Sequence, residues 1–184
     1  MAEYITREFI TGADLREMRA LLGLTQKELA SFLRCSKRAV ENWETKAEKI
    51  TGPLVPLLEI LIRHPEQANA LELPRERLKL RLWYYYEHQV CTIIDVDELK
   101  QMVSIRNYTN NPLMRAFGIN TEPTFEDYKE FLASRCFPET RDKMKLQLKE
   151  LGIPFYDPLL IIEKTEGRMA DDHFWIRIDR GRRE

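Results

Sequence analysis

The residues whose types could do specific chemistry lie close together between Ser36 and Glu44. Arg38 could bond guanine through two N–H groups, Asn42 could bond adenine, and Glu41 could accept a hydrogen bond from cytosine N4. These pairings are the ones by which proteins read base edges in the major groove of DNA. That groove is about 12 Å wide and admits one helix, so the chemistry requires a helix over this stretch.

A small local excess of basic residues surrounds the stretch. Lys46 and Lys49 are cations of the kind that can contact phosphates, which position a protein on DNA without specifying its sequence. Since the excess between residues 34 and 49 is only two, we expect tight binding to need two copies of the chain. The basic residues are Arg34, Lys37, Arg38, Lys46 and Lys49, and the acidic ones are Glu41, Glu44 and Glu48.

Two capped helices separated by a short turn are predicted to position these side chains. Thr25 caps the first, and Glu28 three residues later completes a capping box. After a turn at residues 34–35, Ser36 caps the second, which runs to about Thr45 and buries Ala39, Val40 and Trp43.

Further helices are predicted on both sides of this pair. One covers residues 14–22, with Asp14 as N-cap or first-turn acid and Gly23 as its stop. Another opens at Gly52–Pro53 and ends at His64–Pro65, because a residue before proline leaves the helical region. Residues 66–71 form a further turn or short helix, so four or five helices are expected over residues 11–72.

The pair and its surroundings resemble the Xre/Cro family of helix-turn-helix domains over residues 11–65. The segments that carry the resemblance are Leu24–Ala30, Ser36–Glu44 and the leucine-rich stretch through His64-Pro65-Glu66, which is most similar to antitoxins of the MqsA and HigA types. The resemblance implies that Gln26 lies at a phosphate or at the first base. It also implies that the later helix faces the groove. The implied DNA-binding set is Gln26, Lys27, Ser36, Lys37, Arg38, Glu41, Asn42, Lys46 and Lys49.

Two other interpretations of this region stay open. It could be an ordinary small helical bundle in which residues 37–44 form a solvated face. It could also be a genuine helix-turn-helix domain that contacts protein rather than DNA. The helix caps and the small residues where the helices cross favour the DNA-binding interpretation.

The second half is predicted to be an α+β domain over residues 81–184, after a linker at 73–80. Strands over 80–86, 90–96 and 102–108 with short connections indicate an antiparallel meander. About three helices follow, over 125–135, 139–151 and 159–165, and 173–178 is a possible fourth strand. The overall fold class is therefore mainly α, with an α+β second domain.

The second half offers chemistry-bearing residues but no catalytic motif. The run Trp83-Tyr84-Tyr85-Tyr86 could stack single-stranded bases, yet its neighbourhood is not basic enough for that role, so core or interface is the favoured interpretation. Acidic clusters at 95–98 and 171–172 are as typical of turns as of magnesium sites. Arginines 135, 141, 168 and 177 could form an anion site, although their spacing does not require one. An enzyme is not expected.

Composition narrows the class of protein further. The net charge is −1, and the three cysteines and three histidines are scattered, which argues against a disulfide framework, a structural metal or a cofactor. No apolar run approaches the roughly 18 residues of a membrane helix. The first ten residues lack the apolar core of a signal peptide, so a cytoplasmic protein is expected.

The sequence thus predicts a sequence-specific regulator, a repressor that binds a palindromic site on double-stranded DNA as a homodimer. The main alternative is an antitoxin, or a mobile-element (anti-defence) inhibitor. In that alternative the first domain represses its own operon, and residues 81–178 bind a toxin or nuclease. An effector-binding regulator is a third possibility, which needs a sizeable pocket in the second half.

Overall fold

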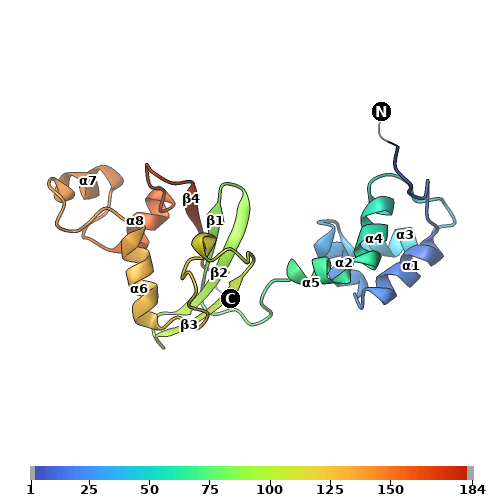
Figure 1. Ribbon diagram of the computed structural model, residues 1–184, viewed down its shortest axis with the longest axis horizontal. Coiled ribbons are helices and arrows are strands. Elements are labelled where there is room, and N and C mark those ends of the chain that lie inside the picture. Colours follow the sequence, from blue (N-terminus) through green and yellow to red (C-terminus); the bar gives the residue numbers. More distant parts are fainter. Residues whose placement is uncertain (1–2, 182–184) are drawn as a thin grey trace. The chain divides into compact units, whose positions relative to one another are not determined.

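The computed structural model describes residues 3–181, and these form eight α-helices, one short 3-10 helix and a four-stranded antiparallel sheet (Figure 1). A mixed α+β composition, which the sequence predicts, is therefore confirmed. The chain divides into two compact units, Met1–Glu72 and Leu73–Glu184. Residues 182–184 of the expected second domain lie outside the described residues.

The described part of the first unit is helical apart from one isolated bridge between Ile10 and Ile50. Leu15, Leu29 and Leu58 are fully buried in its core. Burial of such side chains stabilises the unit by about 1.5–3 kcal/mol each. The helices are α1 (Gly12–Leu21), α2 (Gln26–Phe32), α3 (Lys37–Thr45), α4 (Leu54–Arg63) and α5 (Pro65–Ala70).

Hydroxyl caps fix the starts of α1, α2 and α3. The side chains of Thr11, Thr25 and Ser36 each accept a hydrogen bond from a backbone N–H three residues on, at 3.2 Å. In α1 and α2 a carboxylate bonds back to the cap, which makes a capping box. Helix α1 begins at Gly12, two residues earlier than predicted, because Thr11 is its cap and Asp14 is the first-turn acid.

The first helix starts against the end of α3, at a point that leaves no room for a side chain. A Cβ atom at Gly12 would lie 2.5 Å from the carbonyl oxygen of Trp43. This close approach lets α1 cover the C-terminal turn of α3 and fixes the angle between the two helices.

The second unit is built on a sheet of strand order β3-β2-β1-β4, in which every neighbouring pair is antiparallel. Strands β1 to β3 follow one another along the chain, whereas β4 returns from the C-terminal end to pair with β1. The strands are β1 (Leu80–Tyr86), β2 (Gln89–Asp97), β3 (Met102–Asn107) and β4 (Phe174–Asp179).

Helices cover one face of this sheet. Figure 1 shows α6 (Phe125–Ser134) and α8 (Pro158–Thr165) beside the strands, with α7 (Met144–Leu151) beyond them. Leu82, Ile94 and Ile176 point into the core on this side. The 3-10 helix η1 (Pro112–Met114) lies in the connection from β3 to α6.

The structure differs from the prediction at the start of α7. Helix α7 begins at Met144 rather than at Glu139, because Lys143 adopts a left-handed conformation (φ 63°) that a right-handed helix cannot include. The expected linker is tied to the second unit, since Arg81 Nη2 donates to the carbonyl oxygens of Pro74 at 3.3 Å and Glu76 at 3.4 Å. Among the described residues, none of the helices is both long and apolar enough to cross a membrane.

Candidate nucleic-acid interface

Helix α3 is held on α2 by a turn of four residues, 33–36. Arg34 takes the left-handed conformation (φ 55°) that ends many helices, and Cys35 N–H then donates to the Ala30 carbonyl oxygen at 3.0 Å. Val40 is fully buried on the inner side of α3, and Trp43 packs against the same core. The helix is therefore anchored along one side and open along the other.

The open side of α3 carries side chains that are not engaged elsewhere. Lys37, Arg38 and Asn42 are exposed. Within residues 3–181, the side chains of Arg38 and Asn42 form no hydrogen bond or ion pair. Their donors and acceptors are available to a partner, as readers of base edges must be.

Two other predicted groove residues are paired with each other. Lys37 Nζ lies 2.7 Å from the Glu41 carboxylate, one helical turn away. Both side chains are about half exposed (56% and 42%). A surface pair of this kind contributes only about 0–1 kcal/mol, so a phosphate or a base can compete for either member.

The predicted phosphate contacts lie next to the end of α3. Lys49 Nζ is 3.9 Å from the ring centroid of Phe9, and Lys46 is loosely paired with Glu48 at 3.8 Å. Lys46 and Lys49 line an open hollow of about 370 Å³ together with Asn42. The structure thus brings a base-reading candidate and two cations to one depression.

The remaining predicted residues lie at the start of α2 and of α3. Lys27 is exposed. The Ser36 hydroxyl is occupied by its capping bond to Ala39 N–H. Gln26 is half-buried, and its Nε2 donates to Glu44 Oε2 at 2.9 Å, which fixes its side chain against α3.

Glu44 is a buried charge that sequence reasoning missed. Its side chain is 2% exposed, and Arg19 Nε of α1 donates to Oε1 at 2.6 Å. Arg16 adds a hydrogen bond to the Glu44 carbonyl oxygen at 2.9 Å. One carboxylate therefore ties α1, α2 and α3 together behind the open side of α3.

The network fixes the ionisation of Glu44. Burial raises the pKa of this carboxyl, but the hydrogen bonds from Arg19 and Gln26 and the charge of Arg19 outweigh burial, so the pKa is held below its ordinary value. The hydrogen bond to Glu44 likewise raises the pKa of Arg19. The pair stays charged at neutral pH.

A signal for this pair was present in the sequence. Glu44 lies one turn after buried Val40 on α3, and Arg19 lies one turn after buried Leu15 on α1. Opposite charges at core positions of two neighbouring helices indicate a buried ion pair, because an isolated buried charge costs too much to persist.

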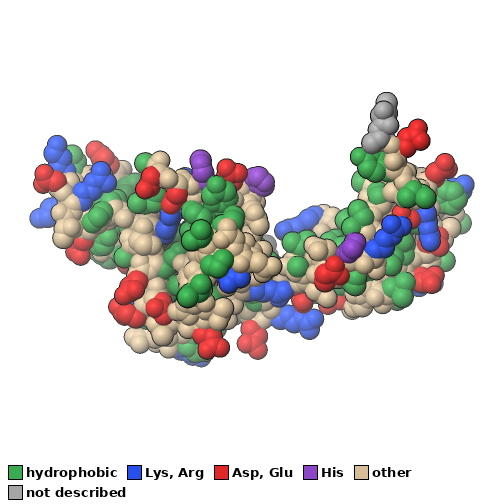
Figure 2. Space-filling view, in the orientation of Figure 1, with side chains coloured by type: hydrophobic (Ala, Val, Ile, Leu, Met, Phe, Trp, Pro, Cys, Tyr) green, Lys and Arg blue, Asp and Glu red, His purple; other side chains and the backbone are tan. Residues whose placement is uncertain are grey.

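The burial of Glu44 changes the electrostatics of the interface. With Glu44 neutralised by Arg19, and with Lys37 and Glu41 offsetting each other, the remaining charges between residues 34 and 49 are four cations and one carboxylate. Elsewhere basic and acidic side chains are interspersed on the face of each unit that Figure 2 shows. The cations are Arg34, Arg38, Lys46 and Lys49, and the carboxylate is Glu48.

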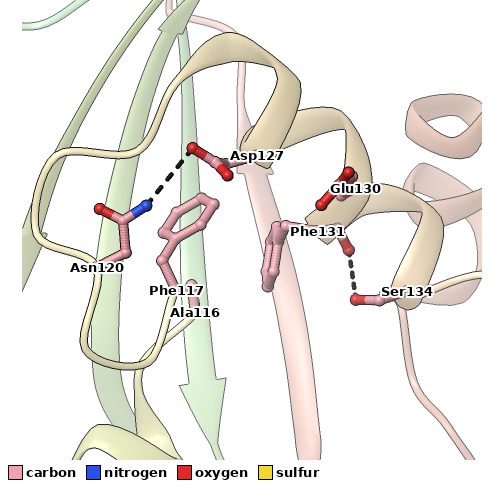
Figure 3. A pocket seen from close by; sticks show the side chains of 7 residues that line it. All are labelled: Ala116, Phe117, Asn120, Asp127, Glu130, Phe131 and Ser134. Carbon is pink, nitrogen blue, oxygen red and sulfur yellow. Dashed lines mark hydrogen bonds between the residues drawn. The ribbon is translucent and has the colours of Figure 1, made fainter.

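An open pocket of about 330 Å³ lies beside α6 in the second unit. Figure 3 shows two hydrogen bonds in its wall. Asn120 Nδ2 donates to Asp127 Oδ2 at 3.5 Å, and Ser134 Oγ donates to the Phe131 carbonyl oxygen at 2.7 Å. Asp127 also completes the capping box of α6. These contacts serve local structure, and Glu130 also lines the pocket.

The acidic and basic clusters of the second half are largely structural. Asp97 accepts backbone N–H bonds from the turn after β2, and Asp172 is bonded to Arg135. Arg135 is buried and also donates to the Gly167 carbonyl oxygen, on the helix-covered side. Within residues 3–181, no group of three or more His, Cys, Asp or Glu side chains is placed to hold a metal ion.

Comparison with known proteins adds no relative, since no family model, no curated protein and no solved structure matches the chain.

Proposed function

We propose that the first unit is a helix-turn-helix DNA-binding domain and that the protein is a sequence-specific transcriptional regulator, acting as a repressor. In this proposal α3 enters the major groove and the N-terminus of α2 faces the phosphate backbone. Arg38 and Asn42 read bases, while Lys46 and Lys49 contact phosphates.

The observation that carries the proposal is the combination of free base-reading side chains with a rigid support. Arg38 and Asn42 have no partner within the described chain, yet the helix that bears them is capped by Ser36 and anchored through buried Glu44. A solvated surface helix needs no such anchoring, whereas a reading helix gains specificity from fixed side-chain positions.

The experiment is a titration of the full chain against duplex DNA taken from the region upstream of its own gene. Binding is measured by fluorescence anisotropy at several salt concentrations. Arg38→Ala should weaken binding to the correct site by about 5- to 150-fold, equivalent to about 1–3 kcal/mol, and should relax specificity at one base pair. Arg63→Ala on α4 is the matched control, because it also removes one exposed arginine. Absence of salt-sensitive binding by the unaltered chain would refute the proposal.

Two copies of the chain are part of this proposal. Four exposed cations give few contacts to phosphates. A two-fold symmetric dimer on a two-fold symmetric site doubles the number of these contacts. Sedimentation of the protein–DNA complex should therefore give two chains per site. A single bound chain at saturation would contradict the homodimer but leave DNA binding standing.

A second candidate keeps DNA binding and adds a protein partner for the second unit, as in an antitoxin or an inhibitor of a toxin or nuclease. The observation that favours it is the exposure of large apolar side chains there: Leu99, Leu113 and Ile119 are 85–87% exposed. Apolar side chains exposed to this degree mark a protein contact where they form a continuous patch. Co-purification of a defined protein from the same operon, lost on substitution of these residues by serine, would support this candidate.

A further inference from the structure

The face of the sheet opposite the helices combines aromatic and basic side chains from three strands. Arg177, Trp83, Ile93 and Arg106 are cross-strand neighbours in one row, on β4, β1, β2 and β3. Because side chains alternate between faces, this row lies opposite the core residues. Ile93 is nonetheless fully buried, so side chains on this face must cover it.

Stacked rings and guanidinium groups extend this row. Tyr85 and Trp175, neighbours on β1 and β4, stack with centroids 4.2 Å apart and planes 8° apart. Arg177 lies 4.3 Å from the Trp83 centroid, and Arg168 lies 5.0 Å from that of Trp175. We call these five residues, Trp83, Tyr85, Arg168, Trp175 and Arg177, the arginine–aromatic ladder.

Of the two ladder arginines, Arg177 has its charge available to a partner, whereas Arg168 is paired with Glu166 at 2.8 Å. Arg177 is exposed and, within residues 3–181, forms no hydrogen bond or ion pair. A guanidinium stacked on a ring keeps its N–H donors in its own plane, where phosphate oxygens can accept them. The carboxylates nearest in the sheet are occupied, because Asp95 pairs with buried Arg81 at 2.8 Å and Asp179 with Arg77 at 2.7 Å.

We propose that the arginine–aromatic ladder binds single-stranded nucleic acid. The rings of Trp83, Tyr85 and Trp175 are half-buried, so each keeps some surface on which a splayed base can stack. Arginines beside the rings are suited to the phosphates between the bases. A duplex fits this face poorly, because its bases are stacked inside and a flat sheet does not enter a groove. Trp83 Nε1 is buried without an acceptor among the described residues, and a bridging water would supply one.

A base can take the place of an arginine on a ladder ring without any change in the strand pairing of the sheet. Arg168 and Arg177 are exposed long side chains that cover one face of Trp175 and of Trp83. Base–aromatic stacking is stronger than an exposed cation–π contact, so a base can replace the guanidinium, which then turns to the adjoining phosphate. An acidic protein segment would use the arginines but would gain nothing from the rings.

The test uses the full chain and fluorescein-labelled 12-nucleotide strands of mixed sequence, as RNA and as DNA, with anisotropy measured at several salt concentrations. Arg177→Gln should weaken single-strand binding about tenfold and lower the salt slope by about 0.7, the value of one phosphate contact. Trp175→Leu, which keeps apolar packing, should weaken it by about 5- to 150-fold and reduce quenching of tryptophan fluorescence. The RNA and DNA arms decide which strand is preferred.

Two controls separate the proposal from its rivals. Lys145→Gln removes one exposed cation from α7 and should leave binding unchanged. Arg38→Ala should weaken duplex binding only, whereas Arg177→Gln should weaken single-strand binding only, so this proposal and the duplex-binding proposal can fail separately. The ladder proposal is overturned if single strands do not bind, if Lys145→Gln has the effect of Arg177→Gln, or if a polyglutamate 12-mer competes fully while Trp175→Leu changes nothing.

Discussion

Replacing Glu44 by glutamine is expected to destabilise the first unit by about 2–3 kcal/mol. The substitution keeps the size of the side chain but removes the charge that accepts hydrogen bonds from Arg19 at 2.6 Å and Gln26 at 2.9 Å. Arg19 then faces a neutral amide in a site where its own side chain is only 17% exposed.

The magnitude follows from the burial of the two partners. Removal of one member of a fully buried pair costs about 3–5 kcal/mol, because the other charge is left uncompensated. Glu44 is 2% exposed, but Arg19 keeps partial contact with solvent and also donates to the Leu24 carbonyl oxygen at 2.9 Å. The lower end of the range, near that of a hydrogen bond to a charged group, is therefore expected.

Hydrogen exchange followed by mass spectrometry can measure this loss in the first unit alone. A change of 2–3 kcal/mol corresponds to exchange about 30- to 150-fold faster in peptides from α1 and α3. The matched control is Glu48→Gln, whose carboxylate is 82% exposed and should contribute less than about 0.5 kcal/mol. In a cycle with Arg19→Gln, the double variant should lose less stability than the two single variants together.

The same pair predicts a pH dependence. Because Glu44 has a pKa in the folded chain below the 4.5 of a free glutamate, held there by Arg19 and Gln26 against burial, its contribution is complete above pH 4.5. It is lost as the pH falls through the lower, folded-state pKa. The difference between the unaltered chain and Glu44→Gln should accordingly vanish in acid. Equal stability of Glu44→Gln and Glu48→Gln at neutral pH would refute the reasoning.

Three further predictions concern single sites. Lys46→Ala should lower the salt slope of duplex binding by about 0.9 and weaken all sequences alike, as measured by anisotropy; a loss confined to one sequence would contradict its phosphate role. Gly12→Ala should destabilise the first unit by about 1–3 kcal/mol in urea denaturation, since the new Cβ would lie 2.5 Å from the Trp43 carbonyl oxygen; unchanged stability would show that the contact relaxes freely. Iodoacetamide near pH 8 should label half-buried Cys35 before Cys136, whose pKa burial raises to about 12; mass spectrometry showing equal rates would argue against that burial.

Local rules explain most of the elements that could be predicted from the sequence. The caps at Thr25 and Ser36 and the apolar stripe of α3 depend on residues within one or two turns of each other, so they can be identified without a fold. The same holds for β1 and β2, whose strand-favouring residues are contiguous. The start of α7 was wrong because the left-handed conformation of Lys143 has no sequence signature of its own.

The sequence predicted which residues belong to the candidate interface, but not which of their side chains are paired or buried. Sequence reasoning placed Lys37 and Glu41 at the groove, and the structure pairs them with each other at 2.7 Å. It counted Glu44 among the acids that weaken the basic footprint, whereas burial against Arg19 removes that charge from the surface. The ion pair between α1 and α3 depends on how the two helices pack, and this packing cannot be deduced from the sequence of either helix.

The sequence alone therefore determined the helix pair, the cap residues and the side-chain types that could read DNA, because these follow from short-range spacing. Only the tertiary structure decided which charges are exposed, and it also changed the meaning of the aromatic run that begins at Trp83. The nearest basic residue along the chain, Arg81, is buried in a pair with Asp95, whereas antiparallel pairing places Arg177 of β4 directly beside Trp83 and Arg106 of β3 in the same row. Sheet pairing joins residues that are distant in sequence, so the charge around an aromatic run cannot be read from its flanking residues.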